Sequence, residues 1–225
     1  YDPVGNQVSF TNARGFTTLT TFDPLNHPVL IKDALDGEVV NLYDAMGNVL
    51  QRTDQNGHSD AFTYDRLHRL LTTTDAEGYM TSQGYDPNGN VVSLVDGNNH
   101  ATTFGYDELD RLIHLTNAED ETTRYAYDKL GNRTDLIEAD AVVTHYEYDS
   151  LYRLAAVVLN HQPAAQPGVD VNVRYAYGYD PNGNLEAITD PLTHTTQFVQ
   201  DSLDRLTQEI NPLGNTWQYT YDPVG

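Results

Sequence analysis

Short stretches of apolar or alternating residues recur along the chain, and polar residues with glycine separate them. The apolar segments 91–95 and 112–115 each run into an Asp or Asn, and Thr-rich alternating segments such as Phe62-Thr63-Tyr64 follow the next turn. Runs of about 4 to 8 residues between turn residues are typical of β-strands. The pattern therefore predicts strand, tight turn and return strand throughout, an all-β fold.

The strand pattern repeats every 21 residues, and the repeat is marked by an aromatic residue followed by Asp. A fixed period of this length indicates a tandem array of hairpin units, here about ten, in a single array over residues 1–225. Gln200-Asp201 and Phe22-Asp23 hold two of the eleven positions. The other repeat positions are Tyr1-Asp2, Tyr43-Asp44, Tyr64-Asp65, Tyr85-Asp86, Tyr106-Asp107, Tyr127-Asp128, Tyr148-Asp149, Tyr179-Asp180 and Tyr221-Asp222.

One gap is longer than the rest, and a second period overlies the first. The step from Tyr148 to Tyr179 is 31 residues, and the ten extra residues predict an enlarged hairpin loop near 160–173, rich in Pro, Ala and Gln. Units with Gly-Asn after the Tyr-Asp pair alternate with units carrying Leu-x-Arg or Leu-x-His. This period of about 42 residues predicts two environments for neighbouring hairpins, or growth by duplication of pairs.

The residues of the unit suit their expected places. Asp after the aromatic residue fits an Asx turn, in which a carboxylate accepts backbone N–H groups. Adjacent apolar residues at Leu70-Leu71 indicate a β-bulge after this turn. At the other turn, glycine is expected to supply a positive φ, at Gly15, Gly37, Gly57, Gly78 and Gly214.

Tyrosine is concentrated at the repeat position and two residues before it. A spacing of two places both rings on one face of a strand. Of the 16 tyrosines, 13 occupy these two positions, so successive hairpins are expected to align their rings into ladders that stack edge to face.

Composition and charge limit the classes of binding partner that the chain can have. Only 39% of the residues are hydrophobic, which is low for a globule with a closed core. The net charge of -21 disfavours nucleic acid and anionic membranes, and no apolar run approaches the ~20 residues that span a bilayer. With no cysteine, disulfides and thiolate metal sites are excluded.

The repeat follows one general order: Tyr-Asp-x-x-Gly-Asn, an apolar strand, Thr-Asp-x-x-Gly and a closing Tyr-x-Tyr-Asp. This order resembles the YD repeat of the Rhs family over essentially the whole chain. That family includes bacterial Rhs polymorphic toxins, the B/C components of insecticidal toxin complexes and teneurins. The resemblance implies a continuous sheet that spirals into a hollow shell, which in the toxins encloses a C-terminal effector. It also implies a secreted or cell-surface location.

The resemblance does not extend to the self-cleaving segment of the bacterial shells, which contains Asp-Pro-x-Gly-Leu. Residues 2–5 and 222–225 match part of that pattern, but no Leu follows Gly5, so no protease residues are carried over. The two matching five-residue ends, Tyr1–Gly5 and Tyr221–Gly225, suggest excision from a longer array.

Motifs for catalysis or for binding metals and nucleotides are few in the sequence. The eight histidines lack zinc spacing and are expected at solvent-facing positions, and no nucleophile elbow or phosphate-binding glycine pattern occurs. Calcium is the one cofactor with candidate ligands. Oxygen-bearing side chains cluster at residues 54–57 with Asp60 and at residues 96–99, but neither segment matches an EF-hand loop.

The sequence therefore predicts a scaffold without enzymatic activity or a required cofactor. Its expected partners are further YD repeats of the same parent chain or identical subunits, and an enclosed toxin domain. An alternative is an extracellular filament or adhesion protein, in which unpaired strands at both ends join subunits. An enzyme, either a glycan hydrolase or the family's self-cleaving protease, ranks last because no acid pair stands apart from the repeat.

Overall fold

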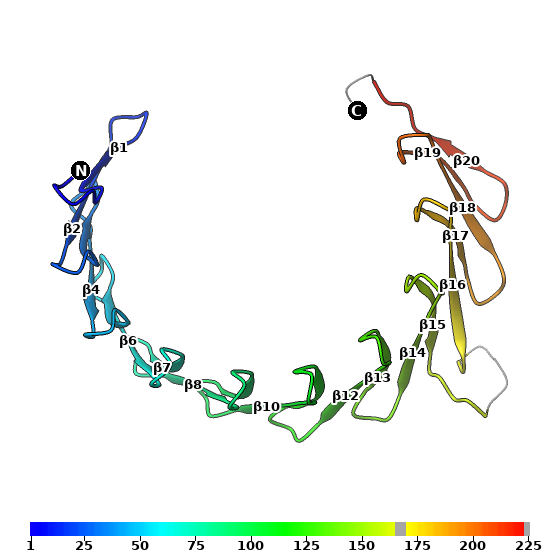
Figure 1. Cartoon of the computed structure of the whole chain (residues 1–225), viewed down its shortest axis with the longest axis horizontal. Coiled ribbons are helices and arrows are strands. Elements are labelled where there is room, and N and C mark those ends of the chain that lie inside the picture. The colour runs from blue at the N-terminus through cyan, green and yellow to red at the C-terminus, as the bar shows by residue number, and fades with distance from the viewer. Residues whose placement is uncertain (165–169, 223–225) are drawn as a thin grey trace. The chain divides into compact units, whose positions relative to one another are not determined.

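The structure, a computed structural model, describes residues 1–164 and 170–222 and contains only strands and turns there. The all-β prediction is confirmed (Figure 1). The strands are β1 (Ser9–Thr11), β2 (Thr17–Phe22), β3 (Pro28–Lys32), β4 (Glu38–Tyr43), β5 (Val49–Thr53), β6 (Ser59–Tyr64), β7 (Leu70–Thr74), β8 (Met80–Tyr85), β9 (Val91–Val95), β10 (Ala101–Tyr106), β11 (Leu112–Thr116), β12 (Thr122–Tyr127), β13 (Arg133–Ile137), β14 (Val143–Tyr148), β15 (Leu154–Leu159), β16 (Val173–Tyr179), β17 (Leu185–Thr189), β18 (Thr195–Gln200), β19 (Leu206–Ile210) and β20 (Thr216–Gln218).

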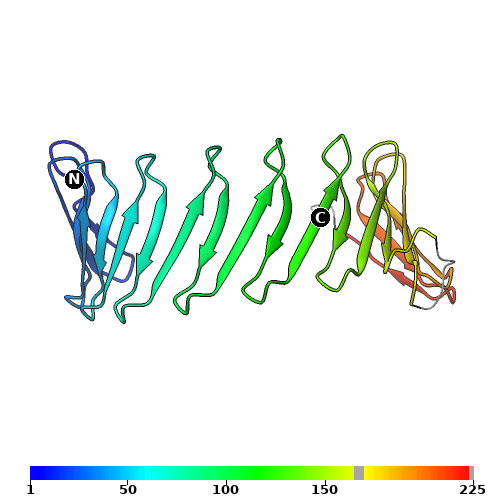
Figure 2. The same ribbon diagram turned by 90° about the horizontal axis from the view of Figure 1, so that it is seen from below.

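The chain divides into two compact units. The first holds Tyr1–Arg111 with Thr116–Asp120, and the second holds Leu112–Leu115 with Glu121–Gly225. Within the first unit each strand from β1 to β10 pairs antiparallel with the next strand along the chain, and β12 to β20 do the same in the second. Figure 2 shows successive hairpins with their turns at the two ends of the strands.

Nearly all turns share one five-residue geometry. The amide of position 1 donates to the carbonyl of position 5, and the amide of position 4 donates back to the carbonyl of position 1, as in Asp44–Asn48 (2.9 and 3.2 Å). Position 4 has a positive φ, so this is the three-residue hairpin loop with a left-handed third residue. We call the turns that begin at the repeat Asp the Tyr-Asp turns: 2–6, 23–27, 44–48, 65–69, 86–90, 107–111, 128–132, 149–153, 180–184 and 201–205. We call those at the other end of the strands the opposite turns: 12–16, 33–37, 54–58, 75–79, 96–100, 117–121, 138–142, 190–194 and 211–215.

Glycine holds the left-handed position in only some of the opposite turns. The prediction is confirmed for Gly15, Gly57, Gly78 and Gly214, whose φ values lie between 81° and 87°. It is wrong for Gly37, because counting from Asp33 places Asp36 at position 4, and Asp36 has the φ of 66°. Asp tolerates this conformation better than most residues.

Thr193 occupies the left-handed position of turn 190–194 with a φ of 68°. A β-branched residue is strained there. We expect Thr193→Gly to raise the free energy of unfolding by about 1 kcal/mol, measured by urea unfolding. Thr195→Gly, within β18, serves as the control and should lower stability by about 0.5–1 kcal/mol. A loss in both variants would show that Thr193 is not strained.

The expected bulge is present after the Tyr-Asp turns. Thr63 pairs with Thr72, but Tyr64 pairs with Leu70, so Leu71 has no partner across β6 and β7. The same register shift occurs in β2–β3, β4–β5, β8–β9, β12–β13, β14–β15, β16–β17 and β18–β19. The extra residue explains the two adjacent apolar side chains at this place in the repeat.

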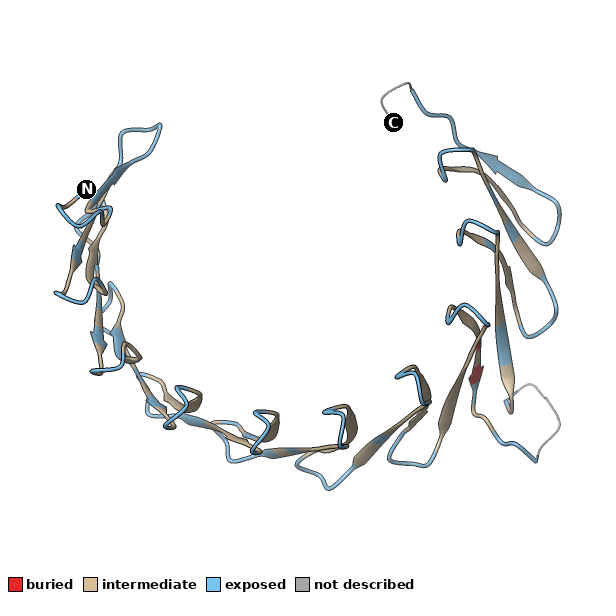
Figure 3. Cartoon of the chain, in the orientation of Figure 1, coloured by how far each residue is buried: buried red, intermediate tan, exposed pale blue. Residues whose placement is uncertain are grey.

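Very little of the described chain is buried. Ala156 (0% exposed) and Val158 (5%) on β15 are the buried hydrophobic residues of the described part (Figure 3). The hairpins thus form a single layer in each unit, stabilised by neighbouring strands and turns. Among the described residues there is no helix that could cross a bilayer.

Candidate functional site: the Tyr-Asp turns

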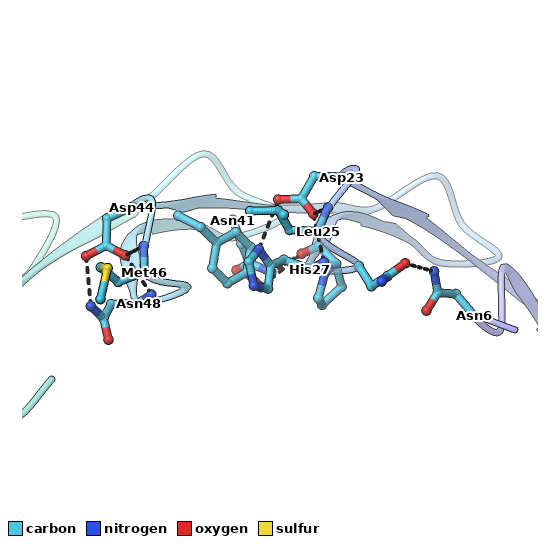
Figure 4. Close-up of polar contacts among 11 residues, drawn as sticks. Asn6, Asp23, Leu25, His27, Asn41, Asp44, Met46 and Asn48 are labelled. Carbon is cyan, nitrogen blue, oxygen red and sulfur yellow. Dashed lines mark hydrogen bonds and ion pairs between the residues drawn. The ribbon is translucent and has the colours of Figure 1, made fainter. Parts of the chain in front are cut away.

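The repeat Asp organises each Tyr-Asp turn through its carboxylate. In turn 44–48, Asp44 Oδ1 accepts the amides of Met46 and Asn48 (both 2.9 Å), and Oδ2 accepts the Asn48 side-chain amide (2.8 Å; Figure 4). The hydrogen bonds from the side chain and backbone of Asn48 hold the pKa of Asp44 below its usual value. This is an Asx turn with every carboxylate oxygen in use.

The alternate turns replace Asn at position 5 by Arg or His. In turn 201–205, Arg205 donates to Asp201 Oδ2 through Nε (2.9 Å) and Nη2 (2.7 Å), while the amides of Leu203 and Arg205 donate to Oδ1. The Arg205 side-chain hydrogen bonds lower the pKa of Asp201. Equivalent pairs join Asp65 to Arg69, Asp107 to Arg111 and Asp149 to Arg153, each with a closest distance of 2.7 Å.

These depressed pKa values predict loss of stability in acid. A carboxylate whose pKa is lower in the folded chain stabilises the fold above its unfolded pKa of about 3.9, and that contribution is lost as the pH falls through the folded value. We expect Asp201→Asn to lower the urea midpoint at pH 7. The difference from wild type should shrink steadily below about pH 4. A difference that is constant with pH would mean that the ionised carboxylate is not what stabilises the turn.

Neighbouring Tyr-Asp turns are linked side chain to side chain. Position 5 of a Gly-Asn turn contacts position 4 of the next turn: Asn6 donates to Asn26 Oδ1 (2.8 Å) and Asn90 to Asp110 Oδ1 (2.7 Å). Asn184 donates to Asp204 in the same way, whereas Asn48 meets His68 through its Oδ1, which lies 3.0 Å from His68 Nδ1.

The link from an Arg or His turn to the next Gly-Asn turn is made by the Arg or His side chain at position 5. Arg69 stacks 4.4 Å from the Tyr85 ring centroid, and its Nη1 donates to the Asp86 carbonyl (3.2 Å). Arg153 covers Tyr179 and Arg205 covers Tyr221 in the same way, and the His27 ring stacks on Tyr43 at 4.7 Å. A Cβ at Gly47 would lie only 3.0 Å from His27 Nε2, so glycine is needed there both for its φ of 89° and for space.

These two kinds of link account for the 42-residue period. Along this sequence each turn with Arg or His at position 5 is followed by a turn with Gly at position 4. Each turn with Asn at position 5 is followed by one whose position 4 is Asn, His, Asp or Tyr. The two predicted environments are therefore present, and they differ in what each turn offers its neighbour.

The repeat tyrosines satisfy backbone carbonyls. The Tyr85 hydroxyl donates to the Leu70 carbonyl (3.0 Å), which lies beyond the last β7–β8 pair, Thr72 with Ser82. Tyr43, Tyr106, Tyr127, Tyr148, Tyr179 and Tyr221 donate equivalently, and where Gln200 replaces tyrosine its Nε2 donates to the Leu185 carbonyl (2.8 Å). The expected edge-to-face tyrosine ladder is wrong for the described residues: the rings of Tyr85, Tyr179 and Tyr221 lie against Arg and that of Tyr43 against His, and no two tyrosine rings stack there.

Most histidines also belong to turns, and not all face solvent as expected. His58, His100 and His194 are exposed at position 5 of opposite turns, with Nδ1 3.0–3.3 Å from the position 1 carboxylate. His27, His114, His145 and His161 are half-buried instead. The His27 ring stacks on Tyr43, and the His145 and His161 rings stack on each other.

At the two turns considered for calcium, the carboxylates already have donors. Asp54 and Asp96 each accept two backbone amides on Oδ1 and a histidine on Oδ2. Within residues 1–164 and 170–222, no three His, Asp or Glu side chains are placed to hold a metal ion. Calcium at these turns would have to displace the turn's own hydrogen bonds. That the chain requires no cofactor stays a prediction.

A polar cluster that the sequence did not indicate covers the buried residues of β15. Asp135 Oδ1 lies 2.7 Å from His145 Nδ1, and the His145 ring stacks on His161 at 4.6 Å. Arg174 donates to Glu147 (2.8 Å), which lowers the Glu147 pKa. The His161 amide donates to the Val143 carbonyl (2.7 Å), so the start of the enlarged connection 160–172 is attached to β14. Residues 165–169 of that loop lie outside the described residues.

The first and last Tyr-Asp pairs, at the two ends of the chain, differ in how much of their turn the structure describes. Tyr1 is 83% exposed, while Asp2 forms an ordinary Asx turn with Val4 and Asn6. Tyr221 and Asp222 are described, but the rest of the last turn, 223–225, lies outside the described residues.

A family model described as RHS Repeat matches residues 43–80, 85–122, 107–143 and 201–225, more than half of the sequence. The chain belongs to the RHS repeat family. The comparison with curated proteins gave no significant match.

Solved structures with the same fold include three toxin assemblies. The crystal structure of TcdB2-TccC3-Cdc42 matches with a TM-score of 0.64 and 20% identity, over 84% of this RHS repeat chain and 12% of that chain. TcdB2-TccC3 matches with a TM-score of 0.59 and 18% identity, over 86% of this chain and 14% of that chain. The Photorhabdus luminescens Tc holotoxin pore matches with a TM-score of 0.54 and 19% identity, over 87% of this chain and 13% of that chain. This RHS repeat chain thus corresponds in length to about an eighth of each.

Proposed function

We propose that this RHS repeat chain is a structural scaffold, one segment of a β-shell wall that encloses or displays a C-terminal effector outside the cell. The observation that carries the proposal is the use of the turn Asp, Arg, Asn and Tyr side chains to bond one hairpin to the next. The fold shared with TcdB2-TccC3 supports a wall, and the holotoxin match supports an extracellular setting.

A non-enzymatic role agrees with this use of side chains. The repeat carboxylates that a hydrolase would need accept backbone amides, Asn or Arg within their own turns. Partners that fit are further RHS repeats, which extend the pairing, and an enclosed domain.

A second candidate, an end-to-end filament, is favoured by the terminal strands. In the described part of the chain β1 pairs with β2 and β20 pairs with β19, so each keeps one unpaired side. Unpaired strands recruit further strands.

Negative-stain electron microscopy of the purified chain over a concentration series tests the two. Discrete particles of uniform outline, no larger than a dimer, support the wall segment. Filaments that lengthen with concentration would contradict it and support the second candidate.

A further inference from the structure

Position 3 of the Tyr-Asp turns carries an exposed apolar side chain in both units. Its amide donates to the position 1 carboxylate, as Leu67 does to Asp65 (2.8 Å), so the backbone is fixed while the side chain is free. In the first unit Val4, Leu25, Met46, Leu67 and Leu109 are 63–73% exposed; we call these five residues the apolar row. In the second unit Leu130, Leu151 and Leu203 continue the pattern at 64–70%.

The opposite turns lack such a row. Their position 3 is polar in six of the nine turns (Arg14, Asn56, Glu77, Asn98, Glu119 and Asp140) and leucine in the other three. The Tyr-Asp turns are polar at this position only at Asn88 and Asn182. Turn geometry therefore does not require an apolar residue at position 3, and the row needs another explanation.

Two hollows lie beside members of the row, one at Val4 and one at Met46. One of about 540 Å³ is lined by Val4, Val8, Thr21 and Phe22, among others, and one of about 470 Å³ by the equivalent Met46, Leu50, Thr63 and Tyr64. The two hollows are 42 residues apart, and so are Leu25, Leu67 and Leu109. Four strand spacings separate each pair, roughly 19 Å.

An occupant that makes the same contact at every hollow must present an apolar group with the same spacing. The row itself does so. We propose that two copies of this chain associate along their Tyr-Asp turns, with the exposed leucines of each copy seated in the hollows of the other. Equal spacing of leucines and hollows allows a two-fold arrangement in which both copies use the same surface.

Charge along these turns is compatible with the contact. Although the chain carries -21, the Asp of two leucine-bearing turns pairs with Arg inside its own turn, Asp65 with Arg69 and Asp107 with Arg111 (both 2.7 Å). The repulsion that remains comes from acids such as Asp2 and Asp44, which line the two hollows, and Asp110 beside Leu109. Salt screens exposed charges over about 8–10 Å. Association should therefore strengthen as NaCl is raised. This association does not depend on the proposed wall function.

Sedimentation velocity over a concentration series tests the proposal. We expect a monomer–dimer equilibrium for the wild type. The variant Leu25→Asn/Leu67→Asn/Leu109→Asn should weaken it roughly tenfold or more, because three apolar contacts are lost. Asn is the residue that turns 86–90 and 180–184 already carry at this position. The control Leu35→Asn/Leu192→Asn/Leu213→Asn changes leucines of opposite turns that are 71–86% exposed, and should leave dimerisation unchanged.

A wild type that stays monomeric at every concentration and in high salt would overturn the proposal. So would an equal loss in the control variant, or growth beyond dimers. If circular dichroism shows that the triple variant is unfolded, Leu67→Asn alone is read by the same criteria. A monomeric chain with uniform particles in the microscope would reject dimerisation while leaving the wall function standing.

Discussion

Ala156→Asp should lower the free energy of unfolding by about 3 kcal/mol or more. Ala156 has no exposed surface and pairs across the sheet with Glu147 on one side and Ala176 on the other. A carboxylate there would be buried and would face the ionised Glu147 at cross-strand distance, about 5 Å between Cβ atoms. Urea unfolding followed by circular dichroism gives the loss.

The matched control is Ala76→Asp. Ala76 is exposed at position 2 of turn 75–79, and an exposed turn substitution should change stability by less than about 0.5 kcal/mol. Because repeat arrays can unfold in parts, hydrogen exchange should show the Ala156→Asp effect centred on β14 to β16. Equal losses in the two variants would mean that β15 is not a local core.

Tyr85→Ala should cost about 2–3 kcal/mol, and Tyr85→Phe about 1 kcal/mol. The alanine variant removes the ring that Arg69 covers as well as the hydroxyl bond to Leu70, whereas phenylalanine removes only the hydroxyl. Phe22, at the equivalent repeat position, shows that the ring alone is accepted.

Tyr64→Phe is the control for the hydroxyl. Within the described part of the chain the Tyr64 hydroxyl makes no hydrogen bond, so this substitution should change stability by less than about 0.5 kcal/mol. The same urea measurement serves all three variants. If Tyr64→Phe and Tyr85→Phe cost the same, the carbonyl bond would not be the source of the stability.

The hairpins and their phase could be predicted from the sequence because every unit repeats the same turn residues. The bulge was visible in the pair Leu70-Leu71. At Gly37 the sequence holds enough information to correct the prediction, because Asp33 begins the turn and the fourth residue of each five-residue turn is the left-handed one, whatever its identity. The Asp–His pairs also had a signal, since His27, His58, His100 and His194 each follow an Asp by four residues.

The links between turns could not be predicted. Asn90 reaches Asp110 and Arg69 reaches Asp86 across 20 and 17 residues, and such distances depend on how far apart strands lie in the sheet. The tyrosine partners were misjudged for a similar reason. Alignment on one face is expected to bring the rings together, but the arginine of the preceding turn lies over Tyr85, Tyr179 and Tyr221 instead.

The pairing of unlike turns limits how the gene for such an array can change length. Loss of one 21-residue unit by recombination would put two turns of the same class in succession. Two Gly-Asn turns would lack the position 4 side chain that Asn90 contacts at Asp110, and two Arg turns would place a side chain where Arg69 now lies beside Gly89. Loss or gain of two units keeps every neighbour correct. Alleles of this array should therefore differ in length by multiples of 42 codons, while single-unit deletions should be selected against.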